Sequence, residues 1–153
     1  MNQPIIAMAL ETHIDKLIQD WSLAVRDDPR IESDAKLSDP ELIDHVPAII
    51  EEICELIRKR EMPSVRNSHE ARVNVYMRFW QGYKGRDLIR ELSLLRITLL
   101  EFLKEISLNA SFGINAEQSH DAAILLNLYL DEEMRYAISV FSNSADSPSP
   151  QTV

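Results

Sequence analysis

Hydrophobic residues recur at helical spacing over residues 86–108, where the pattern of the chain is clearest. Six of them follow one another in alternating steps of four and three: Leu88, Leu92, Leu95, Leu99, Phe102 and Ile106. This heptad-like seam predicts a helix that packs against others along its length. Four more apolar residues widen the stripe: Ile89, Ile97, Leu100 and Leu103. We therefore expect a central helix with neighbours on more than one side.

The same spacing predicts a helix over residues 4–26, which the polar residues 27–30 end. Ser38 or Asp39 is a suitable cap for the next helix. Pro47 falls inside that segment, and a proline in a helix interior removes one hydrogen bond and clashes with the preceding turn. The sequence therefore predicts a break at this proline, with a short helix before it, over residues 41–45, and a longer one after it, over residues 47–60.

Two further helices are predicted towards the C-terminus. The first covers residues 64–81, and Gly82 is placed to end it with a left-handed residue. Asn115, with Gln118 three residues later, forms an N-terminal capping signal. The last helix is expected to begin there and to extend to about Phe141.

Composition fits these helices. The chain has 153 residues, 45% of them hydrophobic, and only 3 glycines, which favours one all-α domain. Short connections between helices predict a single-domain antiparallel bundle of about five helices, with a globin-like arrangement as the alternative. We place this helical sensory or interaction domain at residues 1–142. Residues 143–153 have too few apolar groups to pack and are predicted to be a disordered tail or linker.

Charge and cysteine content limit the partners and the setting. A formal net charge of -9 disfavours nucleic-acid binding, and no apolar run is long enough to span a bilayer. Cys54 has no second cysteine to pair with, and the N-terminus lacks the basic start of a signal peptide. We expect a cytoplasmic protein, with no nucleic-acid or membrane partner.

Candidate functional residues lie on one predicted face of the helix over residues 64–81. The four-three spacing collects Val65, His69, Arg72, Tyr76, Phe79 and Tyr83. A buried arginine or histidine needs polar partners, and the next helix offers Glu91 and Arg96. We therefore predict a polar cluster between the two helices. Its candidate ligand or coupling residues are His69, Arg72, Tyr76, Glu91 and Arg96. The alternative is an ion-pair network that only fixes helix register.

Catalytic, metal and cofactor sites are not predicted. The histidines never pair at positions i and i+4, and the chain has no Cys–Cys motif. Two alternatives remain open for His69. Residues 68–72 (SHEAR) are similar to the phosphoacceptor helix of histidine kinases, which indicates a phosphotransfer protein. A small-ligand or haem-binding helical protein, with His69 as a haem ligand, is the other.

Three stretches together resemble the RsbRD-type N-terminal sensory domain of stressosome co-antagonists and sensor histidine kinases. The first comprises residues 21–30 and 37–47, the second joins His69 and Arg72 to residues 78–83, and the third is residues 87–96. The resemblance covers most of residues 14–105. It rests on the order and spacing of these phrases, which are degenerate when taken singly.

The resemblance implies a non-catalytic signal-transduction input module, cytoplasmic and homodimeric. Its expected partners are a kinase or an anti-sigma-factor switch in a stress response. No kinase, PAS or STAS domain follows residue 142, so we expect either a stand-alone relative or the N-terminal region of a histidine kinase.

Overall fold

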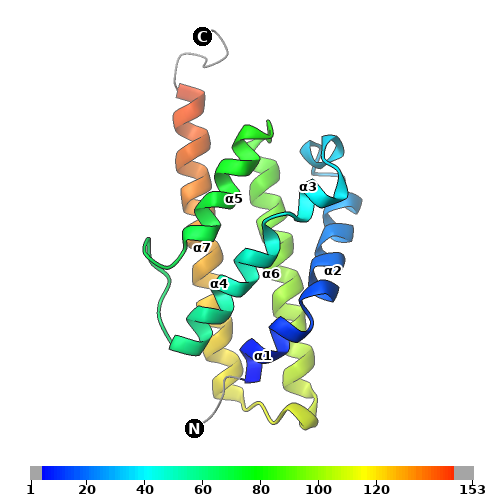
Figure 1. Ribbon diagram of the computed structural model, residues 1–153, viewed down its shortest axis with the longest axis vertical. Coiled ribbons are helices and arrows are strands. Elements are labelled where there is room, and N and C mark those ends of the chain that lie inside the picture. Colours follow the sequence, from blue (N-terminus) through cyan, green and yellow to red (C-terminus); the bar gives the residue numbers. More distant parts are fainter. Residues whose placement is uncertain (1–4, 147–153) are drawn as a thin grey trace.

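The computed structural model describes residues 5–146, and every regular element in that range is a helix. In chain order these are α1 (Ile5–Thr12), α2 (Ile14–Asp27), the 3₁₀ helix η1 (Ser33–Lys36), α3 (Asp39–Ile43), α4 (Val46–Lys59), α5 (His69–Trp80), α6 (Gly85–Leu108), the 3₁₀ helix η2 (Ala110–Phe112) and α7 (Ala116–Asp146). The prediction of an all-α helical bundle is confirmed (Figure 1).

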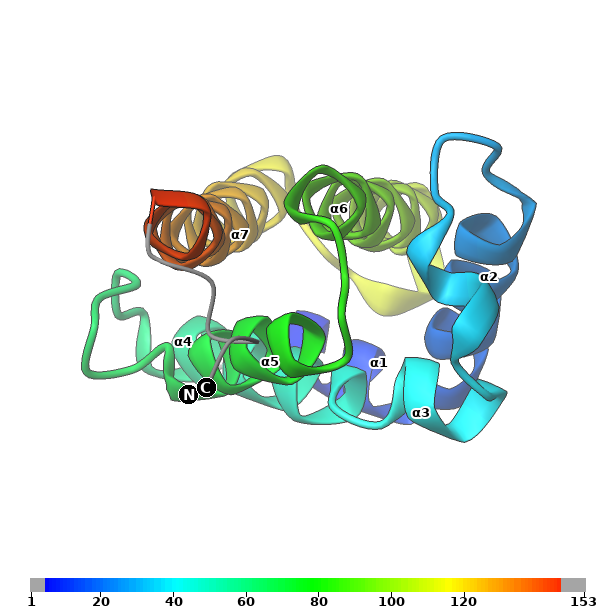
Figure 2. The same ribbon diagram turned by 90° about the horizontal axis from the view of Figure 1, so that it is seen from above.

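The helices form two layers around one core (Figure 2). α6 and α7 lie side by side and antiparallel in one layer, and α4, α5 and α1 form the other. α2 packs against α6 and closes one edge. All six residues of the predicted seam on α6 are buried, which confirms that helix as a central one. Ile97, predicted to widen the stripe, is instead half exposed.

The helix predicted over residues 4–26 is broken at His13. The backbone of His13 leaves the helical region, with φ −107° and ψ 18°. Its ring packs against Phe102 with 5.3 Å between centroids, and its Nδ1 lies 2.8 Å from the carbonyl oxygen of Ala9. The break lets α1 pack on α4 while α2 packs on α6. Periodicity alone does not reveal it, because both halves keep a helical pattern.

The break before Pro47 is confirmed. Ser38 caps α3 in a capping box, in which its Oγ accepts from the Glu41 amide at 3.2 Å and Glu41 Oε1 accepts from the Ser38 amide at 2.8 Å. Pro47 lies in the first turn of α4, where an absent N–H costs nothing. Arg60 caps the C-terminal end of α4, and its φ of +53° lies in the left-handed region that usually holds glycine.

α5 begins at His69, five residues later than predicted. Asn67 holds the preceding segment in a turn: its Oδ1 accepts from the Ser64 amide at 2.7 Å, and its Nδ2 donates to the Met62 carbonyl at 3.0 Å. The predicted end is confirmed, since Gly82 has a φ of +78°.

α7 is longer than predicted. Asn115 and Gln118 cap it reciprocally, with backbone-to-side-chain distances of 2.8 and 2.9 Å, as expected. The helix continues past Phe141 to Asp146, so residues 143–146, assigned to the tail, are helical. The rest of the predicted tail lies outside the described residues. None of the helices within residues 5–146 is both long and apolar enough to cross a membrane.

Candidate functional site

Four polar side chains from three helices meet in the interior: Asn74 and Arg78 of α5, Glu91 of α6 and Glu133 of α7. We call them the buried polar network. All are almost fully shielded from solvent, with Arg78 at 1% and Glu133 at 0% exposure. A buried charge is tolerated only when it is paired or hydrogen-bonded, so each partner of these groups has to be found.

Arg78 and Glu91 form the ion pair of this network, with 3.0 Å between Nε and Oε1. Burial raises the pKa of the Glu91 carboxyl, and the neighbouring Arg78 guanidinium opposes that shift. The backbone carbonyl of Glu91 also accepts a hydrogen bond from the indole N–H of Trp21, at 3.0 Å. The ion pair therefore joins α5 to α6, and the hydrogen bond from Trp21 joins α2 to α6.

Arg78 also holds the C-terminal end of α3. Its Nη2 donates to the carbonyl of Leu42 at 2.6 Å and its Nη1 to the side chain of Gln81 at 2.8 Å. The carbonyls at a helix C-terminus have no partner within the helix, which makes them suitable acceptors for a guanidinium. The guanidinium carbon also lies 4.9 Å from the centre of the Tyr83 ring. One side chain thus joins three helices.

Glu133 has the weaker position in the network. Nδ2 of Asn74 donates to its Oε2 at 2.9 Å, while its Oε1 and Oδ1 of Asn74 have no hydrogen-bond partner among the described residues. Burial raises the pKa of Glu133 to about 8. The carboxyl is therefore protonated over most of the range below neutrality, and a proton on Oε1 would supply the donor that Oδ1 of Asn74 lacks.

A second polar group links α4, α5 and α7 beside this network. The Tyr129 hydroxyl donates to Glu52 Oε1 at 2.6 Å, and the same oxygen accepts from the amide of Glu70 at 3.0 Å. Nε2 of His45 lies 2.8 Å from Oε1 of Glu70. These contacts fix the register of the three helices.

The structure does not bring the predicted site residues together, apart from placing Glu91 in the interior. His69 is exposed at the start of α5. Arg72 donates to the carbonyl of Val65, at 2.6 Å, within its own segment. Arg96 is half buried against α7, where it binds Asn127 at 3.0 Å and Asp131 at 2.7 Å. A cluster of His69, Arg72, Glu91 and Arg96 is not formed.

The predicted face of α5 was wrong by about a third of a helical turn. The buried residues of α5 are Ala71, Asn74, Val75 and Arg78, whereas the stripe predicted to face inward includes the exposed Val65 and Tyr76. The aromatic residues gave the misleading signal. Ala71 and Val75, four residues apart, continue to Arg78 at a further step of three, and that short pattern was the available clue.

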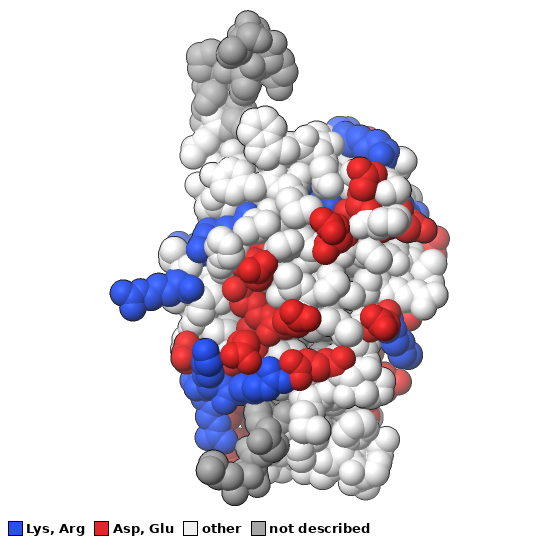
Figure 3. Space-filling model, in the orientation of Figure 1, with Lys and Arg blue, Asp and Glu red and all other residues white. Residues whose placement is uncertain are grey.

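The aromatic residues of α5 instead line its outer side. The rings of Tyr76 and Tyr136 meet with 5.8 Å between centroids, and Phe79 contacts Trp80 at 5.6 Å and Phe141 at 5.5 Å. Trp80 is 78% exposed and Tyr76 is 49% exposed. We call these five residues the aromatic surface. Charged side chains are absent from the area over the upper half of α5, while acidic ones gather over α4 (Figure 3).

Two further observations concern single residues. Cys54 is buried, and burial raises the pKa of its thiol to about 12, so it is a core residue. The phosphotransfer alternative requires an exposed imidazole, and His69 is exposed. His69 does not line the cavity of about 460 Å³ between α1, α4 and α7, so the haem alternative gains no support from that cavity.

The fold and the buried polar network define the class of this protein as a helical bundle with a charged network in its core. Comparison of the chain with protein-family models, with curated proteins and with solved structures gives no match. The resemblance to the RsbRD-type domain therefore stays a prediction. Within the described residues, no group of histidine, cysteine and carboxylate side chains is arranged to hold a metal ion.

Proposed function

We propose that this chain is a non-catalytic, cytoplasmic signal-transduction input module that works as a homodimer through its aromatic surface. The observation that carries the proposal is the exposure of Trp80 and Tyr76 on one side of α5. Large aromatic side chains left in water on a folded domain mark contact sites, and tryptophan and tyrosine are the residues most enriched at the energetic centres of interfaces.

The charge distribution favours a second copy of the chain as the partner. Each copy carries a formal net charge of -9, so two copies repel each other wherever acidic faces meet. The area over the upper half of α5 has no charged side chains in view, whereas acidic residues gather over α4 (Figure 3). A two-fold contact through the uncharged area keeps like charges apart and buries the aromatic rings.

The buried polar network gives the proposed module a way to transmit that contact. Tyr76 and Trp80 lie on the outer side of α5, and Asn74 and Arg78 lie on its inner side. A shift of α5 on dimerisation would change the distances from Arg78 to α6 and α3, and from Asn74 to α7. The resemblance to sensory domains makes a kinase or an anti-sigma-factor switch the expected receiver. Such a coupling requires two arrangements of the network with different free energies.

Sedimentation equilibrium of the full chain at micromolar concentrations tests the proposal. We expect a reversible dimer for the native chain, and at least tenfold weaker association for Trp80→Ala and for Tyr76→Ala, because each removes a ring from the centre of the interface. Leu108→Ala is the matched control: Leu108 is 77% exposed, but at the far end of α6. A strictly monomeric native chain, or equal weakening by Leu108→Ala, would contradict the proposal.

A further inference from the structure

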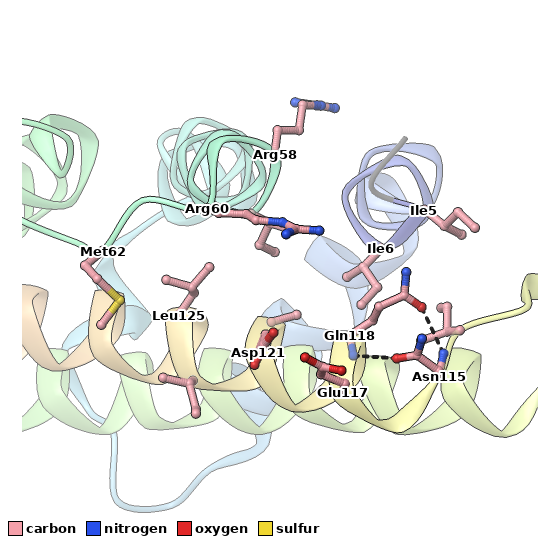
Figure 4. Close-up of a pocket in the computed structure, with 14 residues that line it drawn as sticks. Ile5, Ile6, Arg58, Arg60, Met62, Asn115, Glu117, Gln118, Asp121 and Leu125 are labelled. Carbon is pink, nitrogen blue, oxygen red and sulfur yellow. Dashed lines mark hydrogen bonds between the residues drawn. The ribbon is translucent and has the colours of Figure 1, made fainter. Parts of the chain in front are cut away.

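A cavity of about 460 Å³ opens between the end of α4, the start of α1 and the first turns of α7 (Figure 4). Its volume falls within the range of about 300–1,000 Å³ that is typical of small-molecule sites. Much of its lining is apolar and includes Ile5, Ile6, Ile57, Met62, Ile124 and Leu125. The cavity can therefore shield the apolar part of a small ligand from water.

Four charged side chains also line this cavity: Arg58, Arg60, Glu117 and Asp121. Arg60 reaches into it from the end of α4, and Glu117 and Asp121, one turn apart on α7, lie on the opposite side (Figure 4). Among the described residues, the side chains of Arg60, Glu117 and Asp121 form no ion pair and no hydrogen bond with any partner. Arg58, two residues before Arg60, differs, because it is paired with Glu11 and Glu55.

The backbone of Arg60 supplies a separate argument. Its φ of +53° and ψ of 40° place it in the left-handed region, at a helix C-terminus where glycine would adopt the same conformation with less strain. Residues with strained backbone conformations cluster at active sites and ligand-binding sites. Here the strained residue carries a cation that lines the cavity.

We propose that this cavity binds a short apolar peptide with free termini, of the size of a dipeptide. The guanidinium of Arg60 donates to the peptide carboxylate, Glu117 and Asp121 accept from its ammonium group, and the apolar wall covers its side chains. Among the described lining residues, two unpaired carboxylates against one unpaired arginine disfavour an anion, and a simple cation leaves Arg60 unpaired. A zwitterion satisfies both sides of the cavity.

This site goes beyond the proposed function, since the cavity lies at the opposite end of the bundle from the aromatic surface and needs no dimer. Peptide binding and dimerisation can therefore fail separately. Trp80→Ala, made to weaken the dimer, is expected to bind the peptide with an unchanged Kd.

Isothermal titration calorimetry of the full chain with L-leucyl-L-leucine tests the inference. We expect saturable binding to one site per chain. N-acetylated and C-amidated leucyl-leucine should each bind at least tenfold more weakly, because each lacks one of the two charges. Absence of saturable binding by the unmodified dipeptide would overturn the proposal, as would equal affinity for all three compounds.

Arg60→Gly separates the loss of the site from the loss of the fold. Glycine relieves the left-handed backbone, so this variant should have a Tm equal to or above that of the native chain, yet bind leucyl-leucine at least tenfold more weakly. Arg66→Gly, at an exposed arginine of the α4–α5 loop, is the control and should bind normally. An unchanged Kd for Arg60→Gly would remove the arginine from the site and overturn the assignment.

Discussion

Glu133 is a carboxyl at the centre of the bundle with one hydrogen bond to hold it. Several groups act on it: Asn74 and Arg78 from α5, Glu91 from α6, and Glu52 from α4, besides Tyr129 of its own helix. Burial is the largest influence, the two glutamates add to it, and together they outweigh Asn74 and Arg78, so the pKa rises to about 8. In the unfolded chain the pKa of this carboxyl is its ordinary 4.5, so the unfolded chain releases the proton near pH 4.5. The native state still holds the proton there.

Stability should depend on pH through this proton. A carboxyl whose pKa is raised by folding does not lower the free energy of unfolding below about pH 4.5, because both states are protonated there. Between about 4.5 and 8 the unfolded chain loses the proton and the native state keeps it, so the free energy of unfolding falls by about 1 kcal/mol per pH unit. Above about pH 8 both states have released the proton, so this group lowers the free energy of unfolding no further.

Glu133→Gln removes this dependence. The glutamine keeps an acceptor for Asn74 Nδ2 and brings an N–H group that Asn74 Oδ1 lacks. We expect the variant to match the native chain at pH 5 and to exceed it at pH 8, in urea unfolding followed by tryptophan fluorescence. Glu101→Gln, at an exposed position on α6, should leave the free energy of unfolding unchanged at both pH 5 and pH 8. A native chain with flat stability from pH 5 to 8 would contradict the pKa of Glu133.

Among the helices, α5 has a buried polar side and an exposed aromatic side. Its inner side carries Arg78, which binds α6 through Glu91 and α3 through the Leu42 carbonyl. Its outer side carries Tyr76 and Trp80. The helix is short, and only part of its inner side is apolar, so its position depends on polar contacts more than that of α6 does. In the proposed dimer, α5 is therefore the element on which contact at the aromatic surface would act.

Removing one partner of the Arg78–Glu91 pair should destabilise the fold strongly. Arg78→Met leaves the Glu91 carboxyl buried and unpaired, and Glu91→Leu does the same to the guanidinium, so each should lower the free energy of unfolding by about 3–5 kcal/mol. The double variant should lose clearly less than the sum of the two. Urea unfolding of all four proteins measures the coupling.

An exposed pair on α7 provides the control for that cycle. Arg135 and Glu132 lie 3.3 Å apart on the surface of the helix. Surface pairs contribute less than about 1 kcal/mol, so Arg135→Met, Glu132→Leu and their double variant should stay close to the native value. Additive losses for Arg78→Met and Glu91→Leu would show that the two side chains act independently.

At the scale of the whole molecule, the net charge opposes the proposed dimer, and the aromatic surface is the part that would favour it. Two copies at -9 each repel over a range set by the ionic strength, about 10 Å at 0.1 M salt and about 3 Å at 1 M. Contact between uncharged aromatic rings is not weakened by this screening. The balance between the two terms should therefore shift towards the dimer as salt is added.

Added salt thus distinguishes an aromatic interface from an ionic one. We expect the dissociation constant of the dimer to fall several-fold between about 0.05 and 0.5 M sodium chloride, measured by sedimentation equilibrium. Trp80→Ala should stay weak at both concentrations. A dimer that dissociates on addition of salt would point to charged contacts and against the aromatic surface.

The sequence alone determined most of the helix ends, because the signals for them act over a few residues. Ser38 and Glu41 cap α3, Asn115 and Gln118 cap α7, and Gly82 follows the end of α5 in a left-handed conformation. Each of these depends on backbone groups no more than four residues away. The buried seam of α6 could also be predicted from the sequence, because its apolar residues repeat along a single helix.

Only the tertiary structure decided which polar side chains of α5 are buried. Arg78 meets Glu91 across 13 positions of the chain, and Asn74 meets Glu133 across 59. The aromatic stripe through Tyr76 looked like a core face, yet burying Arg78 in its place became favourable because Glu91 and the end of α3 were both within reach. A local pattern cannot contain that information, because the cost of burying a charge depends on the distant groups that the fold brings to it.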